Sequence, residues 1–176
     1  DSLFTQGMVC HETYKDENNN WLSPEEIERV GNKVVKKNDH NKVIKVGPSE
    51  SMSKSKKNVV DPEFIINNYG ADAVRLFILS DSPPEKDVQW SEQGMVSSYK
   101  FIQKLWALHT NIKNKILNEN SEDFDEEIEK FTNQLIEKIT NNLEKFNYNV
   151  IIANMYETFN YLSNYIKKNK NLKNLE

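Results

Sequence analysis

The sequence predicts a mainly helical α+β fold, in which a small β-hairpin region is followed by an antiparallel helical bundle. Short apolar and β-branched runs, separated by polar turns, fill the region before residue 60. Beyond residue 96, apolar residues instead recur at helical spacing along successive stretches. A chain of 176 residues has room for one medium domain or two small ones.

The first expected element is a strand at residues 3–10, which is short, apolar and β-compatible. Polar residues at 15–20 predict a turn, and Trp21-Leu22 would form the returning strand. Ser23-Pro24-Glu25-Glu26 has the cap, first-turn proline and third-position glutamate of a capping box. That pattern predicts a short helical turn, with a bend as the alternative.

A second hairpin is expected from the runs at 33–36 and 42–46, which flank a polar turn at 38–41. The following stretch, residues 50–58, places closely spaced lysines among serines and predicts a mobile basic loop. Such a loop suits a polyphosphate, because ammonium groups supply charge while hydroxyls and backbone N–H groups supply donors. A solvated surface loop is the alternative that composition leaves open.

Two short helices should follow this loop. Asp61-Pro62 is a helix-start signal, and Gly70 offers a stop, which predicts a helix over 62–69. The next helix starts at once and must end before Ser82-Pro83-Pro84, since two prolines forbid its continuation. Residues 85–90 are expected to form a connecting loop, and Ser91 can cap the next element.

Three amphipathic helices are expected in the remainder of the chain. Their apolar stripes are Tyr99, Ile102, Leu105, Trp106, Ile112 and Ile116; then Phe124, Ile128, Phe131, Leu135 and Ile139; then Ile151, Met155, Phe159, Leu162 and Ile166. The junctions at 118–121 and 144–147 are short enough to make the helices antiparallel neighbours. Trp106, Trp90 and Tyr99 are assigned to the core, and the alternative is a stacking platform for bases.

The net charge of -4 conceals an uneven distribution, because lysines cluster between residues 33 and 57 and acids between 119 and 129. Screening confines each patch to a Debye length of roughly 8 Å, so a net-acidic protein can still hold a polyanion locally. The single Cys10 excludes a disulfide framework and fits a reducing compartment. No run approaches the ~20 apolar residues of a membrane span, and a cytoplasmic protein without membrane contact is expected.

Several kinds of site are absent from the sequence. The histidines His11, His40 and His109 have no metal-ligand spacing to one another or to Cys10, so no metal site is expected. No nucleophile elbow, Walker loop or dinucleotide glycine motif is present. The basic loop is therefore the strongest functional candidate.

Residues Ser51-Met52-Ser53-Lys54-Ser55 resemble the Lys-Met-Ser-Lys-Ser signature of class I aminoacyl-tRNA synthetases. The resemblance continues through Lys56–Pro62 and Tyr69–Phe77. Three further segments resemble the leucine enzymes in particular: Gln6–Val9, Ser82–Ser91 and Phe146-Asn147. The chain is identified as a segment of the leucyl-tRNA synthetase family, and only residues 33–46 and the terminal tail carry little of the resemblance.

This resemblance implies a parent enzyme that activates leucine with ATP, together with Mg2+, and transfers it to tRNA(Leu). It implies that Lys54 is catalytic and touches the triphosphate, that Met52 anchors the loop, and that Ser53 and Ser55 supply donors or hold its conformation. The ATP-binding set would thus be Met52, Ser53, Lys54 and Ser55. Lys100 and Lys104 are candidate tRNA contacts, although exposed lysines are ordinary on any helix. A monomer is expected.

The family also implies a division of the chain. Residues 1–60 would be the C-terminal part of a Rossmann-type catalytic domain, including the signature loop. Residues 61–95 would be stem-contact helices and a connector, and residues 96–176 the start of an anticodon-binding helical bundle. The absence of an initiator Met at Asp1 fits a piece cut from the C-terminal half of a longer chain.

The sequence departs from the family at two places. Ser51 stands where the signature has its first lysine, and a hydroxyl cannot replace that charge, although Lys56 or Lys57 could compensate. The family's histidine-glycine-histidine motif is absent, so these 176 residues alone are not expected to catalyse. Two alternatives stay open: a valyl, isoleucyl or methionyl enzyme, and a non-catalytic helical RNA-binding module.

Overall fold

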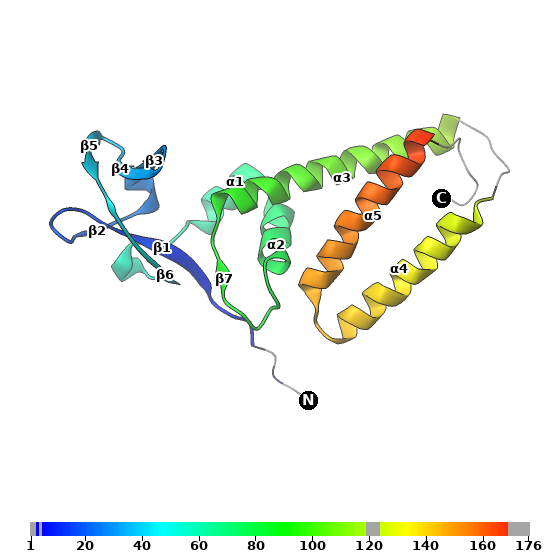
Figure 1. Cartoon of the computed structure of the whole chain (residues 1–176), viewed down its shortest axis with the longest axis horizontal. Coiled ribbons are helices and arrows are strands. Elements are labelled where there is room, and N and C mark those ends of the chain that lie inside the picture. The colour runs from blue at the N-terminus through cyan, green and yellow to red at the C-terminus, as the bar shows by residue number, and fades with distance from the viewer. Residues whose placement is uncertain (1–2, 4, 119–123, 169–176) are drawn as a thin grey trace.

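The structure, a computed structural model, describes residues 3, 5–118 and 124–168 and has an α+β fold with its larger strands at one end and its long helices at the other (Figure 1). The predicted fold class is confirmed at this level. The expected linker at 118–121 and the acidic block at 119–129 lie partly outside the described residues. No helix within the described ranges is long and apolar enough to cross a membrane.

A four-stranded sheet is built around β1 (Val9–Lys15). The strand β6 (Lys45–Ser51) runs antiparallel along one edge of β1, with His11 opposite Glu50. Since that edge is occupied, β2 (Trp21–Leu22) and β7 (Val88–Gln89) share the other edge, antiparallel and parallel to β1 respectively. The strand predicted at 3–10 is therefore displaced toward the C-terminus, while the predicted return at Trp21-Leu22 is confirmed.

A second, three-stranded sheet consists of β3 (Ile27–Val30), β4 (Lys33–Lys36) and β5 (Asp39–Val43). The 3-10 turn η1 (Pro24–Glu26) precedes it and has the predicted capping box at Ser23. The hairpin prediction was wrong in its second strand, because β5 ends at Val43 and the chain from Lys45 joins β1 instead. Tyr14, Leu22, Val34 and Ile44 form the buried cluster at this end.

Two short helices follow the signature region, α1 (Pro62–Tyr69) and α2 (Ala71–Ser80), as predicted. The Asp61 carboxylate accepts a hydrogen bond from the Glu63 N–H at 3.0 Å, which satisfies one of the free donors of the first turn. Between these helices and β7 lies a buried cluster: Ile65, Ala73, Phe77, Val88 and Met95.

A close backbone crossing fixes β7 beside the start of β1. The Gly7 N–H donates to the Pro84 carbonyl at 2.8 Å, and a Cβ atom on Gly7 would lie 2.1 Å from the Lys86 carbonyl oxygen. Only glycine fits at this crossing. The segment predicted to be a plain connecting loop at 85–90 is therefore partly a strand of the sheet.

The long helices are α3 (Glu92–Asn118), α4 (Glu126–Glu144) and α5 (Tyr148–Lys168). Figure 1 shows α5 between α3 and α4, with α4 and α5 antiparallel. The Phe101 ring packs on Tyr156 and Phe159, and Leu76, Phe101 and Ile152 form a buried cluster that joins α2 to this layer. Three consecutive amphipathic helices are thus confirmed.

Trp106 does not belong to the core. Its side chain is 73% exposed, whereas Phe101 and Leu108 on the same helix are 5% and 7% exposed. At 100° per residue, Trp106 lies more than a quarter turn away from the direction that those two residues face. The core assignment of Trp106 was therefore wrong.

Candidate functional site

The candidate site is the segment from Glu50 to Asn58, which begins as the last residues of β6 rather than as a free loop. A 3-10 turn, η2 (Lys54–Lys56), forms its tip, and the Ser53 hydroxyl caps that turn by accepting the Lys56 N–H at 3.3 Å. Lys57 has a φ of 54°, in the left-handed region, and the backbone reverses there. The predicted basic loop is thus a compact capped turn at the end of a strand.

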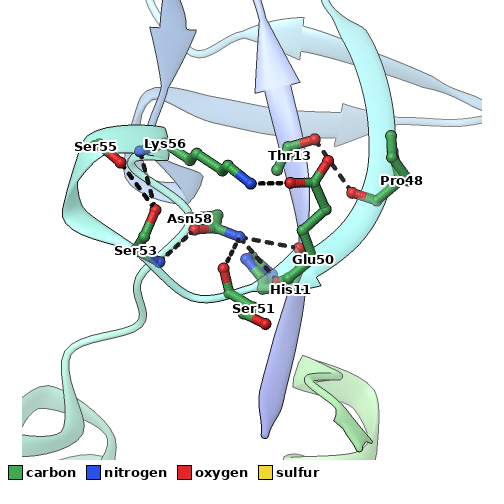
Figure 2. Close-up of polar contacts among 9 residues, drawn as sticks. All are labelled: His11, Thr13, Pro48, Glu50, Ser51, Ser53, Ser55, Lys56 and Asn58. Carbon is green, nitrogen blue, oxygen red and sulfur yellow. Dashed lines mark hydrogen bonds and ion pairs between the residues drawn. The ribbon is translucent and has the colours of Figure 1, made fainter.

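Asn58 holds this turn against the sheet (Figure 2). Its side chain is fully buried, and its Oδ1 accepts the Ser53 N–H at 2.8 Å. Its Nδ2 lies 3.2 Å from the His11 carbonyl, 3.1 Å from that of Glu50 and 3.4 Å from that of Ser51. One amide group therefore connects the turn, β6 and β1.

The lysines of the segment are not equivalent. Lys56 forms an ion pair with Glu50, and the Lys57 Nζ lies 3.6 Å from the Glu26 Oε2. Lys54, at the start of η2, has an exposed side chain and forms no ion pair within the described residues. Lys54 is thus the cation of this turn that is available to an incoming anion.

Glu26 is held ionised by its surroundings. Its Oε2 accepts the Ser23 N–H at 2.8 Å, and this hydrogen bond, with the nearby Lys57 charge, lowers the pKa of Glu26. The Lys57 ammonium therefore faces a carboxylate at neutral pH. Exposed pairs of this kind contribute about 0–1 kcal/mol, so they bias the lysines without fixing them.

Ser51 projects away from these ion pairs. Figure 2 shows the Ser51 hydroxyl directed to the opposite side from the Glu50 carboxylate and the Lys56 ammonium. Successive residues of a strand face opposite sides of the sheet, so the opposite directions of Glu50 and Ser51 follow from the β6 backbone. Lys56 and Lys57, the candidates to replace the charge missing at Ser51, are paired with Glu50 and Glu26 respectively.

Met52 lines an apolar cavity of about 170 Å3 between β1, the turn and the two short helices. The cavity is lined by Val9, Met52, Val60, Pro62, Ile65, Ile66, Val74, Ile78 and Trp90. The Ser53 and Ser55 hydroxyl oxygens lie 3.1 Å apart. Side chains at 52, 53 and 55 thus face inward or toward one another, while that of Lys54 is exposed.

A larger groove of about 760 Å3 is lined by residues that include His11, Tyr14, Arg29 and Trp90. Burial lowers the pKa of His11, and the Nδ1 atom of its ring has no hydrogen-bond partner among the residues that the structure describes. Burial and a hydrogen bond to Glu12 raise the pKa of Tyr14 to about 12. Both groups are neutral near pH 7.

The remaining predicted positions lie elsewhere. Lys100 and Lys104 are exposed on α3. Among the residues that the structure describes, no cluster of three His, Cys, Asp or Glu side chains could hold a metal ion. Glu50 and Asn58 lie within the predicted loop at 50–58, but the sequence assigned them no role, because no periodicity or charge pattern separates a structural asparagine from the others in this Asn-rich chain.

Comparison with known proteins shows which family the chain resembles. Residues 30–91 match the family model described as tRNA synthetases class I (I, L, M and V). The leucine–tRNA ligase of Rickettsia massiliae (strain Mtu5) is 46% identical over 172 residues, which are 96% of this chain and 20% of that protein. That of Wolbachia pipientis subsp. Culex pipiens (strain wPip) is 43% identical over 165 residues, 92% of this chain and 19% of that protein.

A solved structure has a similar fold. It is the crystal structure of the ternary complex of Agrobacterium radiobacter K84 agnB2 LeuRS with tRNA and LeuAMS. The match has a TM-score of 0.59 and 25% sequence identity, and it covers 67% of this chain and 16% of the LeuRS chain. The chain spans about a fifth of the length of the curated relatives it matches. The chain belongs to the class I tRNA synthetase family, and over most of its length it is similar to the leucine–tRNA ligases.

Proposed function

We propose that this chain is the part of a leucine–tRNA ligase that carries the signature turn, and that Lys54 stabilises the triphosphate of ATP while leucine is activated. The observation that supports this most is the difference among the lysines. Lys54 is exposed at the start of a capped turn, whereas Lys56 and Lys57 are each paired with an acid.

The proposed reaction explains why a cation is needed there. The leucine carboxylate attacks the α-phosphorus of ATP, which is bound with Mg2+, and the bond to the β-phosphate oxygen breaks. Leucyl-adenylate and pyrophosphate form, and the leucyl group then passes to tRNA with release of AMP. Negative charge grows on the departing pyrophosphate, so a fixed ammonium group stabilises the transition state more than the ground state.

The neighbouring residues have supporting roles. Met52, whose side chain lines the apolar cavity, anchors the turn and so fixes the backbone from which Lys54 projects. Ser53 caps the turn, and its contact with Ser55 keeps both hydroxyls at the tip. Ser51 stands where the signature has its first lysine, so the turn lacks one cation and supplies less electrostatic stabilisation.

We extend the proposal to the rest of the chain by family resemblance. Residues 1–60 belong to the end of a Rossmann-type catalytic domain, residues 61–95 are stem-contact helices and connector, and residues 96–176 begin an anticodon-binding bundle. Lys100 and Lys104, which are exposed on α3, contact tRNA phosphates. Such contacts position a nucleic acid without reading its sequence.

The test is amino-acid-dependent ATP–pyrophosphate exchange by the polypeptide of the complete reading frame. We expect leucine to drive exchange, and Lys54→Ala to lower its rate roughly 10²–10³-fold with little change in leucine binding. Lys56→Ala and Lys57→Ala are matched controls, because they remove the same charge from the same turn and should have much smaller effects.

Two outcomes would contradict the proposal. If valine, isoleucine or methionine drove exchange and leucine did not, the amino-acid assignment would be wrong. The specific role of Lys54 would be refuted if all three lysine variants lost exchange activity equally. It would also be refuted if Lys54→Ala weakened leucine binding by the same factor as it lowered the exchange rate.

A further inference from the structure

Asn58 is a fully buried amide directly after a turn whose other residues are largely exposed or half-buried. A buried polar side chain is tolerated only when its donors and acceptor are paired. The Asn58 side chain meets this requirement, with one accepted hydrogen bond and two N–H groups shared among three carbonyls. The cost of burying it is therefore offset by a fixed arrangement of the surrounding backbone.

The accepted hydrogen bond closes a ring. It joins the Asn58 Oδ1 to the Ser53 N–H at 2.8 Å, so residues 53–58 are tied at both ends and Lys54 lies inside the closed segment. The ring does not rely on the ion pairs of Lys56 and Lys57, because its members are backbone groups and the Asn58 amide.

The donated hydrogen bonds fasten this ring to the sheet. The His11 carbonyl belongs to β1, and the Glu50 and Ser51 carbonyls belong to β6. Displacing the turn relative to the sheet therefore breaks buried hydrogen bonds, which cost about 1–3 kcal/mol when a partner is left unpaired. The Asn58 amide thus joins the turn to both strands.

We propose that Asn58 is a positioning residue for Lys54, and that its amide sets the place from which the Lys54 ammonium reaches the triphosphate. This inference rests on the proposed function of the turn. Catalytic groups must be held within roughly 0.5 Å of their productive position, and a misplacement of about 1 Å can cost 10²-fold in rate. Asn58 acts on the reaction only through Lys54.

The test uses Asn58→Asp in the full-length enzyme. The carboxylate keeps an acceptor for the Ser53 N–H but places a second acceptor oxygen against three carbonyls. We expect kcat for pyrophosphate exchange to fall roughly tenfold to a hundredfold. Thr13→Val is the matched control. The Thr13 side chain is only 1% exposed and, like that of Asn58, joins β1 to β6, but its hydroxyl donates to the Pro48 carbonyl at 3.2 Å and not to the turn.

A double variant separates positioning from simple destabilisation. If Asn58 acts through Lys54, Asn58→Asp combined with Lys54→Ala should be no slower than Lys54→Ala alone. The inference is overturned if the two losses multiply, or if Asn58→Asp and Thr13→Val lower kcat equally at matched loss of thermal stability. If Lys54→Ala itself leaves exchange unchanged, the proposed function fails.

Hydrogen exchange on the unmodified protein tests whether the Asn58 side chain holds the Ser53 N–H, and it needs no variant. We expect the Ser53 amide hydrogen to exchange with solvent as slowly as those of the paired residues of β1 and β6, since Asn58 holds it. Exchange at the rate of an open loop amide would overturn the inference, even if the Asn58→Asp protein did not fold.

Discussion

Gly94→Ala is a sharp test of how α3 packs on α2. A Cβ atom at this position would lie 2.7 Å from Cε2 and 3.1 Å from Cδ2 of Phe77. The Phe77 ring is 4% exposed and lies edge to face with Trp90 at a centroid distance of 5.3 Å. The ring is therefore enclosed and has little freedom to move aside.

Two effects of opposite sign determine the result. Alanine favours the helix over glycine by about 1 kcal/mol, and by less in the first turn. Forcing a methyl group into a close-packed core costs about 1–3 kcal/mol. We expect the clash to prevail and the free energy of unfolding to fall by about 1–2 kcal/mol. For a chain of this size each 1 kcal/mol lowers Tm by about 2–4 °C.

Thermal unfolding of the 176-residue chain measures this loss. Ser97→Ala is a suitable control, because Ser97 is exposed on the same helix and its hydroxyl only donates back to the Gln93 carbonyl at 2.8 Å. Phe77→Leu should partly rescue Gly94→Ala by making space, so the double variant should lose less than the sum of the single losses. A rise in Tm for Gly94→Ala, or strictly additive losses, would refute the packing argument.

Three other predictions concern charge. Ser51→Lys in the full-length enzyme should raise the rate of exchange roughly tenfold, because Lys56 and Lys57 are held by acids; an unchanged rate would mean that one of them already acts there. Burial lowers the pKa of His11 below 6.5, so the neutral imidazole contributes its full stability above pH 6.5, and this contribution is lost as the pH falls through the folded-state pKa. The urea concentration at the unfolding midpoint should therefore decrease on acidification, and His11→Gln should make this decrease smaller. Replacing Lys100 and Lys104 together by Glu should weaken tRNA binding. It should also make the slope of log affinity against log salt concentration shallower by about one per lost phosphate contact, whereas Lys130→Glu on α4 should change neither the affinity nor the slope.

Local signals in the sequence were sufficient for the helices. The Asp61-Pro62 start and the Gly70 stop gave α1 its observed bounds, because capping and the missing proline N–H act within one turn. The double proline after Ser82 likewise ended α2. Trp106 shows the limit of periodicity, since an apolar residue at helical spacing is buried only where a neighbouring helix covers that direction.

The strands depended on pairings that the sequence does not display. Residues 42–46 were expected to pair with the run at 33–36, but from Lys45 onward the chain belongs to β6, whose partner is the distant strand β1. The two residues of β7 are too few to show any period. At the candidate site, the charge pattern predicted which segment to consider, but it could not distinguish Lys54 from the paired Lys56 and Lys57. That difference, and the hydrogen bonds of Asn58, depend on contacts with Glu26, Glu50 and His11.

The placement of β7 has a mechanical consequence. The Val88 and Trp90 N–H groups bond to the Met8 and Cys10 carbonyls, and α3 begins only two residues after Trp90. On the opposite edge, β1 carries β6 and, through the His11 carbonyl, the Asn58 amide. The base of α3 and the Lys54 turn are thus separated by the width of a single strand, and hydrogen bonds join that strand to both of them.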